Sequence, residues 1–194
     1  MLIEDFISAF NRPFVMSKKR SEPFPDANSP AAVLVCIYQF QGEYSVLFTQ
    51  RAEHLKHHGG QISFPGGKAE KHDKNLIETA YREAEEEVGL QAKHLQLIGS
   101  LQPYRTVSGF AVTPIISVYQ PSLNIKTDLV IDKNEVANVF GVPLAYLMEE
   151  KNYSEQIIHR SNKQFPVYFI PYETKLIWGA TAGILSILKD HITL

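Results

Sequence analysis

The sequence is poor in cysteine: Cys36 is the single one among 194 residues. One cysteine excludes an internal disulfide, and the apolar, strand-like run around Cys36 indicates a small core residue. Because disulfide-free chains are typical of reducing compartments, we expect a cytoplasmic protein.

The sequence also lacks a strong charge of one sign and a long hydrophobic run. Its formal net charge is −2 and its isoelectric point is near 6.4. No basic patch therefore points to a nucleic acid or to an acidic membrane surface. No run approaches the roughly 20 apolar residues of a transmembrane helix, and the N-terminus lacks the basic start and apolar stretch of a signal peptide. We expect neither a nucleic-acid nor a membrane partner.

Hydrophobic residues make up 44% of the chain, which is enough for one globular domain over residues 1–194. Residues 1–30 differ from the rest of this domain. Apolar residues on one side of residues 2–11 predict a short helix, and the prolines between residues 11 and 30 predict an irregular arm.

The most informative stretch runs from Gly66 to Leu90 and carries an acidic run within an amphipathic helix pattern. At about 100° per residue, the apolar stripe of this helix gathers Leu76, Ile77, Ala80, Tyr81, Ala84 and Val88. The same spacing puts Glu83 and Glu87 at the edge of the stripe, with Glu86 one turn from Glu83. A helix selected only for solubility would not aim two carboxylates there.

Two interpretations of these acids are open. Three neighbouring carboxylates repel one another and tend to take up protons unless a cation lies between them. Hard oxygen ligands suit Mg²⁺ or Mn²⁺, which keep positions for water and for substrate phosphates. The alternative is an ordinary solvated acidic helix with ion pairs such as Glu78 to Arg82.

The residues around the helix favour a site. Asn75 followed by Glu78 resembles a capping box and Gly89 is a left-handed stop, so we predict a helix over residues 76–88. Before it, Phe64-Pro65-Gly66-Gly67 predicts a strand end and a glycine turn whose backbone can approach a ligand or metal closely.

The pattern from Gly67 to Leu90 resembles the Nudix box, G-x5-E-x7-R-E-U-x-E-E-x-G-U, in which U is an aliphatic residue. Its C-terminal half matches without a gap, as Arg82-Glu83-Ala84-x-Glu86-Glu87-x-Gly89-Leu90. Its first half departs from the box: Asp73 stands where Glu is usual, and one extra residue separates it from Arg82. This departure is similar to the coenzyme A pyrophosphatase branch of the Nudix hydrolases.

A second motif of that branch, L-L-T-x-R-[SA]-x3-R-x3-G-x3-F-P-G-G, can be laid on residues 47–67. Two positions differ, since Phe48 replaces a Leu and Lys56 replaces an Arg. Lysine keeps the positive charge but loses the two-pronged geometry with which arginine grips a phosphate. Two adjoining motifs in the expected order are far more specific than a lone short pattern.

The resemblance implies a role for each matched residue. Glu83, Glu86 and Glu87 would carry the catalysis as ligands of Mg²⁺ or Mn²⁺, with the Gly67 carbonyl as a further ligand. Arg82 would orient the carboxylates, Glu86 in particular, and would not contact the substrate, because on a helical wheel it projects away from Glu83 and Glu87.

On the substrate side the resemblance implies contacts from Arg51, Lys56, Gly66 and Phe110. A surface loop with a buried Phe110 is the structural alternative for the last of these. Nudix enzymes often draw one more carboxylate from a loop beyond the box, as base or ligand. Glu135 is the candidate here, and an ordinary turn acid is its alternative.

The remaining patterns predict the fold. Strands are expected over residues 31–40, 46–49, 95–101, 112–119 and 136–142, a short helix over 144–150, a hairpin of residues 153–159 and 165–172, and a C-terminal helix entered from residues 177–181. These patterns predict an α/β fold, and the resemblance implies a Nudix-type α/β/α sandwich with a mixed β-sheet between the acid-bearing helix and the C-terminal helix.

The resemblance implies hydrolysis of the diphosphate linkage of coenzyme A or a derivative, giving adenosine 3′,5′-bisphosphate and 4′-phosphopantetheine. The partner would be this small-molecule diphosphate, and the enzyme a monomer or homodimer. One alternative is a Nudix hydrolase of another nucleoside diphosphate derivative, such as ADP-ribose or a dinucleotide. The other is a non-catalytic nucleotide-binding module on the same fold, since a fold does not fix a function.

Overall fold

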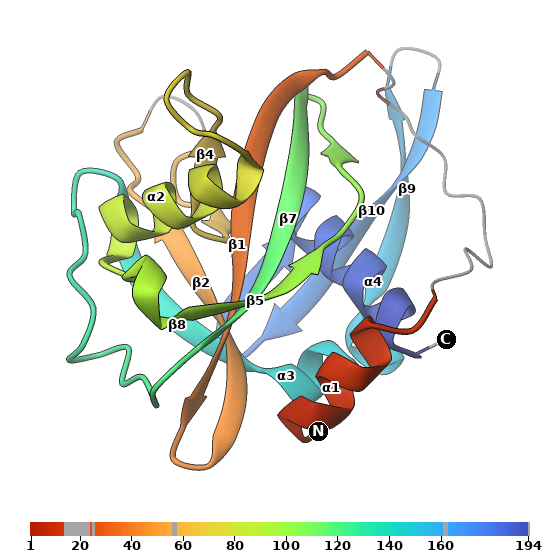
Figure 1. Ribbon diagram of the computed structural model, residues 1–194. Coiled ribbons are helices and arrows are strands. Elements are labelled where there is room, and N and C mark those ends of the chain that lie inside the picture. Colours follow the sequence, from red (N-terminus) through yellow and green to blue (C-terminus); the bar gives the residue numbers. More distant parts are fainter. Residues whose placement is uncertain (14–23, 25, 56–57, 161–162, 194) are drawn as a thin grey trace.

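A mixed β-sheet occupies the middle of the computed structural model, which describes residues 1–13, 24, 26–55, 58–160 and 163–193 (Figure 1). Its strand order is β3-β2-β1-β7-β5, with β4 added at β1, β6 at β7 and β8 at β2. Strands β1 and β7 are parallel, and the other pairs are antiparallel. The strands are β1 (Ser29–Phe40), β2 (Glu43–Arg51), β3 (Ile62–Ser63), β4 (Gly66–Lys68), β5 (Leu95–Ser100), β6 (Tyr104–Arg105), β7 (Phe110–Tyr119) and β8 (Val136–Pro143).

Helices cover both faces of this sheet. The helical elements are α1 (Ile3–Phe10), α2 (Leu76–Val88), α3 (Leu144–Leu147) and α4 (Ala180–Thr193), with the single 3₁₀ turns η1 (Ala92–His94) and η2 (Glu150–Asn152). Of the described helices, none has the length and hydrophobicity needed to cross a membrane.

A second sheet, in the order β11-β10-β9, is made of β9 (Ser154–Arg160), β10 (Lys163–Tyr172) and β11 (Lys175–Trp178).

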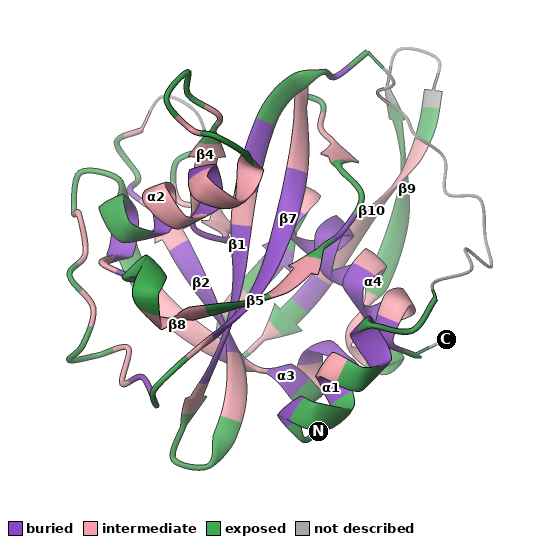
Figure 2. Ribbon diagram, in the orientation of Figure 1, coloured by how far each residue is buried: buried purple, intermediate pink, exposed green. Residues whose placement is uncertain are grey.

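The two faces of β1 point into two separate hydrophobic cores. Leu34 and Cys36 pack with the buried stripe of α2, whereas Val35 and Ile37 pack with α1, α4 and the second sheet. Period-two alternation along a strand produces this division. Buried residues run along β1, β2 and β7 (Figure 2). The predicted α/β/α sandwich is confirmed, and so is the core position of Cys36.

Helix α2 begins and ends where its sequence predicts. The Asn75 side chain accepts hydrogen bonds of 3.0 Å from the backbone N–H groups of Ile77 and Glu78. Gly89 ends the helix with a φ of 74°, in the left-handed region that favours glycine. The Glu78 carboxylate accepts from the Lys74 N–H, one residue before the position that a capping box requires.

Three local predictions are wrong. Residues 175–178 form β11 before the C-terminal helix starts, because Ile177 pairs with Ile170 and both are buried. The short helix ends at Leu147, and η2 follows it separately. Gly66 and Gly67 form strand β4 along β1 and not a free turn.

Strand β4 lies so close to β1 that a side chain at Gly66 has no room. A Cβ there would come within 2.4 Å of the Ala32 carbonyl oxygen and 2.6 Å of the Val33 Cα. Gly66 also has a φ of +154°, which residues with a side chain rarely adopt. Glycine at this position is therefore a condition for the pairing of β4 with β1.

Gly66→Ala is expected to lower the free energy of unfolding by more than about 3 kcal/mol, because the backbone of β1 cannot move aside without breaking the sheet. Gly42→Ala is the control: Gly42 also has a positive φ, +86°, but no atom lies within 4 Å of its added Cβ. That variant should lose only about 1 kcal/mol. Urea denaturation measures both, and equal losses would contradict the steric account of Gly66.

Candidate functional site

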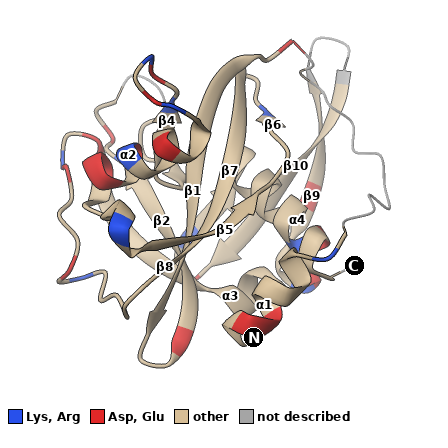
Figure 3. Cartoon of the chain, in the orientation of Figure 1, with Lys and Arg blue, Asp and Glu red and all other residues tan. Residues whose placement is uncertain are grey.

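The acids of α2 face strand β4. A Cβ on Gly67 would lie 2.5 Å from the Glu83 carboxylate, so this carboxylate rests directly against the glycine backbone. Figure 3 shows acidic segments on α2 on either side of one basic segment, and Arg82 is the one basic residue of this helix. The fold therefore brings Gly67 and Glu83 together as predicted, although they are far apart in the sequence.

Glu87 is the most deeply buried of these acids, with 4% of its surface exposed. Burial raises its pKa to about 8, and the carboxylates of Glu135 and Glu83 add to this rise. The Arg51 guanidinium and the Gly66 N–H act in the opposite direction. Its Oε2 atom is buried without a hydrogen-bond partner in the described part of the protein. A buried carboxylate oxygen without a partner costs free energy, which a ligand at that oxygen would offset.

Two predicted site residues reach Glu87 from other parts of the chain. Arg51, at the end of β2, places its Nη1 3.9 Å from Glu87 Oε1. The loop that carries Glu135 is fastened on both sides: the Glu135 carbonyl accepts from the Ala52 N–H at 2.8 Å, and the Asp132 N–H donates to the Glu87 carbonyl at 3.0 Å. The Glu135 carboxylate is close enough to raise the pKa of both Glu83 and Glu87.

Arg82 is turned toward the acids, contrary to the helical-wheel prediction that it projects away from Glu83. Its Nη1 donates to Glu83 Oε1 at 2.9 Å and to Glu86 Oε2 at 3.0 Å. The long side chain bends along the helix surface, which a wheel of Cα positions does not represent. Its orienting contact with Glu86 is as predicted, and Glu83 is held as well.

Asp73 fixes the other side of Arg82. Its two carboxylate oxygens accept from Arg82 Nε at 3.0 Å and Nη2 at 3.1 Å. These bonds, with those from the Glu70 N–H and the Thr79 hydroxyl, hold the pKa of Asp73 well below its usual range. Sequence reasoning missed this role, and its one signal was the match of Asp73 to an acidic position of the Nudix box.

The remaining predicted residues lie apart from the acids or outside the described ranges. Gly67 faces α2, so Lys68, its neighbour on β4, faces the opposite side of the sheet. The Lys68 Nζ lies 5.2 Å from the centre of the Phe110 ring, which places Phe110 beside Lys68 and across the sheet from Glu83. Lys56 is among the residues that are not described.

The carboxylate oxygens of this site fit a hard divalent cation whose remaining ligands are water or substrate oxygens. Glu87 supplies a buried oxygen without a partner among the described residues, and Glu83 lies beside it with a pKa raised mainly by burial. Within residues 26–55 and 58–160, as in the other described ranges, no three acidic, histidine or cysteine side chains form a ready-made cage. Ion pairs with Arg82 hold the Glu83 and Glu86 carboxylates near its guanidinium, which explains why the acids do not gather around one point. A magnesium site that keeps waters and substrate phosphates needs only one or two carboxylates.

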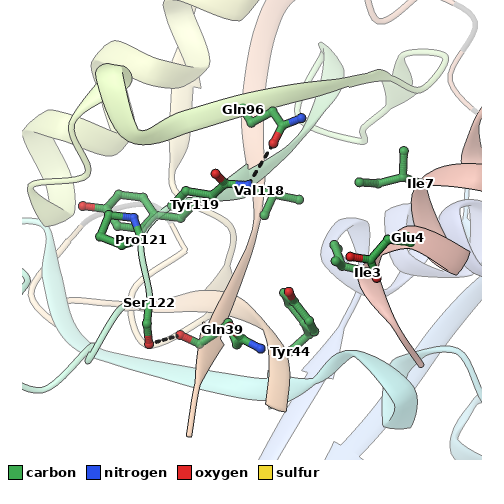
Figure 4. Close-up of a pocket in the computed structure, with 11 residues that line it drawn as sticks. Ile3, Glu4, Ile7, Gln39, Tyr44, Gln96, Val118, Tyr119, Pro121 and Ser122 are labelled. Carbon is green, nitrogen blue, oxygen red and sulfur yellow. Dashed lines mark hydrogen bonds between the residues drawn. The ribbon is translucent and has the colours of Figure 1, made fainter. Parts of the chain in front are cut away.

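A groove of about 410 Å³ lies elsewhere, between α1 and the ends of β1, β5 and β7 (Figure 4). Gln96 accepts from Gln120 there, and Ser122 donates to the Gln39 carbonyl. Among the described residues of its lining Glu4 is the one with a charge, and none of the predicted site residues contributes to it. The chemistry of the α2 acids is therefore not located in this groove.

Asp73→Asn should weaken Mn²⁺ affinity and kcat/KM by roughly 10- to 100-fold, because Arg82 loses the charged partner that fixes its guanidinium. Asp73→Glu retains the charge and should recover most of the activity. Glu70→Gln is the matched control, since it removes an exposed carboxylate from the same loop. Calorimetric Mn²⁺ titration and steady-state kinetics measure the effects. Equal behaviour of Asp73→Asn and Glu70→Gln would contradict this role.

The raised pKa of Glu87 predicts a pH dependence of stability in the metal-free protein. When folding raises the pKa of a carboxyl group, its proton favours the folded state, and this contribution to the free energy of unfolding is complete below the pKa of the unfolded state. The contribution is lost as the pH rises through the pKa of the folded state. The Tm should therefore fall between about pH 5 and pH 8. Glu87→Gln should flatten this slope and raise the Tm at pH 8. Scanning calorimetry in EDTA tests this, and an unchanged slope in the variant would be the contrary result.

The chain is similar in sequence to known proteins over most of its length. The family model described as NUDIX domain matches residues 28–160. The Nudix hydrolase NudL of Yersinia enterocolitica is 37% identical over 192 residues, covering 99% of this chain and 94% of the relative. NudL of Photorhabdus laumondii is 36% identical over 190 residues, covering 98% and 97%.

Solved structures with partial similarity include RenU, a Nudix hydrolase from M. smegmatis. It is 25% identical, with a TM-score of 0.49 over 60% of this chain and 71% of that one. The NUDIX domain of Shewanella oneidensis NrtR, complexed with ADP ribose, is 16% identical, with a TM-score of 0.47 over 75% and 85%. The family assignment rests on the sequence matches, which extend over nearly the whole chain. The chain belongs to the Nudix family of hydrolases.

Proposed function

We propose that this Nudix hydrolase cleaves the diphosphate linkage of coenzyme A or one of its derivatives, with the whole chain acting as one cytoplasmic Nudix domain. The products would be adenosine 3′,5′-bisphosphate and 4′-phosphopantetheine. The observation that carries the hydrolytic part is the buried Glu87 Oε2, which lacks a partner among the described residues and lies beside Glu83 and the glycine strand.

The cofactor in this proposal is Mg²⁺ or Mn²⁺, held by Glu87 and Glu83 with help from Glu86 and the Gly67 carbonyl. When bound, such an ion supplies Lewis acidity: it lowers the pKa of a coordinated water and offsets charge on the diphosphate. The reaction adds water to one phosphorus and breaks its bond to the bridging oxygen, which leaves two phosphate monoesters.

The protein's own groups have separate tasks in this proposal. Arg51 lies at Glu87 and carries a positive charge that suits a diphosphate. The Arg82 pair with Asp73 keeps Glu83 and Glu86 in place. Among the described contacts, no hydrogen bond or ion pair joins the Glu135 carboxylate to Arg82. Glu135 is therefore the candidate to accept the proton of the attacking water.

The substrate part of the proposal rests on the sequence. The motif over residues 47–67 and the Asp73 offset resemble those of the coenzyme A branch. Asp73 also has a contact that suits its shifted position: from the loop before α2 its carboxylate accepts a hydrogen bond from Arg82. Replacement of an arginine by Lys56 leaves ADP-ribose or a dinucleotide as the second candidate substrate.

Glu83→Gln and Glu87→Gln should each reduce Mg²⁺-dependent diphosphate hydrolysis at least about 100-fold, because each removes a charged oxygen ligand. Glu85→Gln, an exposed position on the same helix, is the matched control and should keep full activity. Near-wild-type turnover by either site variant would mean that the metal assignment is wrong.

A substrate panel separates the candidate functions. It compares coenzyme A, its oxidised and acylated forms, ADP-ribose, NADH and diadenosine polyphosphates, each with Mg²⁺ and with Mn²⁺. The proposal expects the highest kcat/KM on a coenzyme A compound, with adenosine 3′,5′-bisphosphate as a product. Preference for ADP-ribose or a dinucleotide would select the second candidate. Absence of turnover on all members would favour the non-catalytic binding module.

A further inference from the structure

Strand β9 has one edge that no described strand covers. It lies at the end of the second sheet, where only β10 pairs with it among the described strands. All residues from 154 to 159 are exposed (Figure 2), including Ile157 at 52% and Ile158 at 39%. Helix α4 packs on β10 and β11. A long exposed edge with apolar residues is a template for pairing with another strand.

The backbone groups at this edge can be assigned from the sheet. The Tyr168 carbonyl accepts from the Gly179 N–H, so the backbone of Tyr168 faces β11, and alternation turns Pro166 the same way. Their partners on β9 are Glu155 and Ile157. In an antiparallel ladder these partners direct their own N–H and C=O groups away from β10, as does His159 two residues further on.

The sequence of this edge is complementary to itself. If a second copy of β9 is placed antiparallel about a two-fold axis at Ile157, this residue faces its own equivalent. Glu155 then faces the partner's His159, and His159 faces the partner's Glu155. Each of these three pairs is of the type that exchanges two main-chain hydrogen bonds. A carboxylate opposite an imidazole is a favourable cross-strand pair, whereas identical charges would repel.

Apolar side chains extend from this edge across the outer face of the three-stranded sheet. Ile158 pairs with Phe165 on that face. Further along it, Trp178 is 44% exposed and stacks on Phe169, with ring centres 6.4 Å apart. Pairing at β9 would cover Ile157 and Ile158 and join two such faces.

We propose that two copies of this chain associate through the outer edges of β9, which join the two three-stranded sheets into one. The self-complementary register selects a second copy over an unrelated strand. This inference is independent of the substrate, since no residue of β9 belongs to the acid site.

Sedimentation velocity over a concentration series tests the pairing. The wild type should approach twice the 21.9 kDa chain mass. Ile157→Pro removes an N–H that points to the open edge and that β10 does not use, so the monomer should fold and the dissociation constant should rise at least about tenfold. Ile157→Val is the matched control, because it keeps the N–H and should keep the dimer.

A charge exchange provides the second arm. Glu155→Lys and His159→Glu should each weaken the dimer, because the first removes the carboxylate that faces His159 and the second places two carboxylates opposite each other. The double variant should restore the dimer, since the two changes together place a lysine opposite a glutamate across the strand pair.

Near-ultraviolet circular dichroism of Trp178 verifies the fold of every variant. A wild type that stays at 21.9 kDa throughout the series would overturn the proposal. So would a dimer that is indifferent to Ile157→Pro and to both single charge changes.

Discussion

The close packing of α2 on the glycine backbone of β4 is the constraint on which the rest of the site depends. Gly66 has no space for a Cβ against the backbone of β1, and a Cβ at Gly67 would displace the Glu83 carboxylate. The caps at Asn75 and Gly89 then fix the length and phase of α2, so that Glu87 enters the buried side one turn after Glu83. A side chain at Gly66 would push β4 away from β1, and one at Gly67 would move the Glu83 carboxylate from its place on the strand.

Burial of the Glu87 carboxylate has an electrostatic cost that burial of an apolar side chain would not have. Glu87 is placed where its charge is poorly solvated, and Arg51 at 3.9 Å compensates only part of that cost. Glu83 and Glu86 are instead stabilised by Arg82, which Asp73 holds from behind. The site thus consists of one carboxylate with an oxygen that lacks a partner among the described residues and two that are kept in position near it. This asymmetry is typical of a site whose stability is completed by a ligand, and natural proteins accept local destabilisation at such places.

The sequence predicted most of what depends on local periodicity. The limits of α2, its caps and the strands β1 and β7 follow from patterns within about 15 residues. The sandwich architecture was implied by the resemblance to Nudix domains. The conformation of Arg82 did not follow, because a flexible side chain can reach along the helix to partners on its near side. The pairing of β4 with β1 and the approach of Glu135 to Glu87 depend on contacts between distant segments, which a single sequence does not encode in its spacing. Strand β11 was missed because four residues before a helix are too few to show alternation.

The central claim is that Glu87 is a ligand for a divalent cation, and proton release on metal binding tests it most directly. Because its pKa is about 8 in the metal-free protein, Glu87 is largely protonated at about pH 6.5 and must lose this proton when it becomes a ligand. Titration of Mn²⁺ in buffers of different ionisation enthalpy should therefore give a release of close to one proton in the wild type. Glu87→Gln should show much weaker binding and lose most of that release. Tight Mn²⁺ binding without proton release, or with the same release in the variant, would contradict the account.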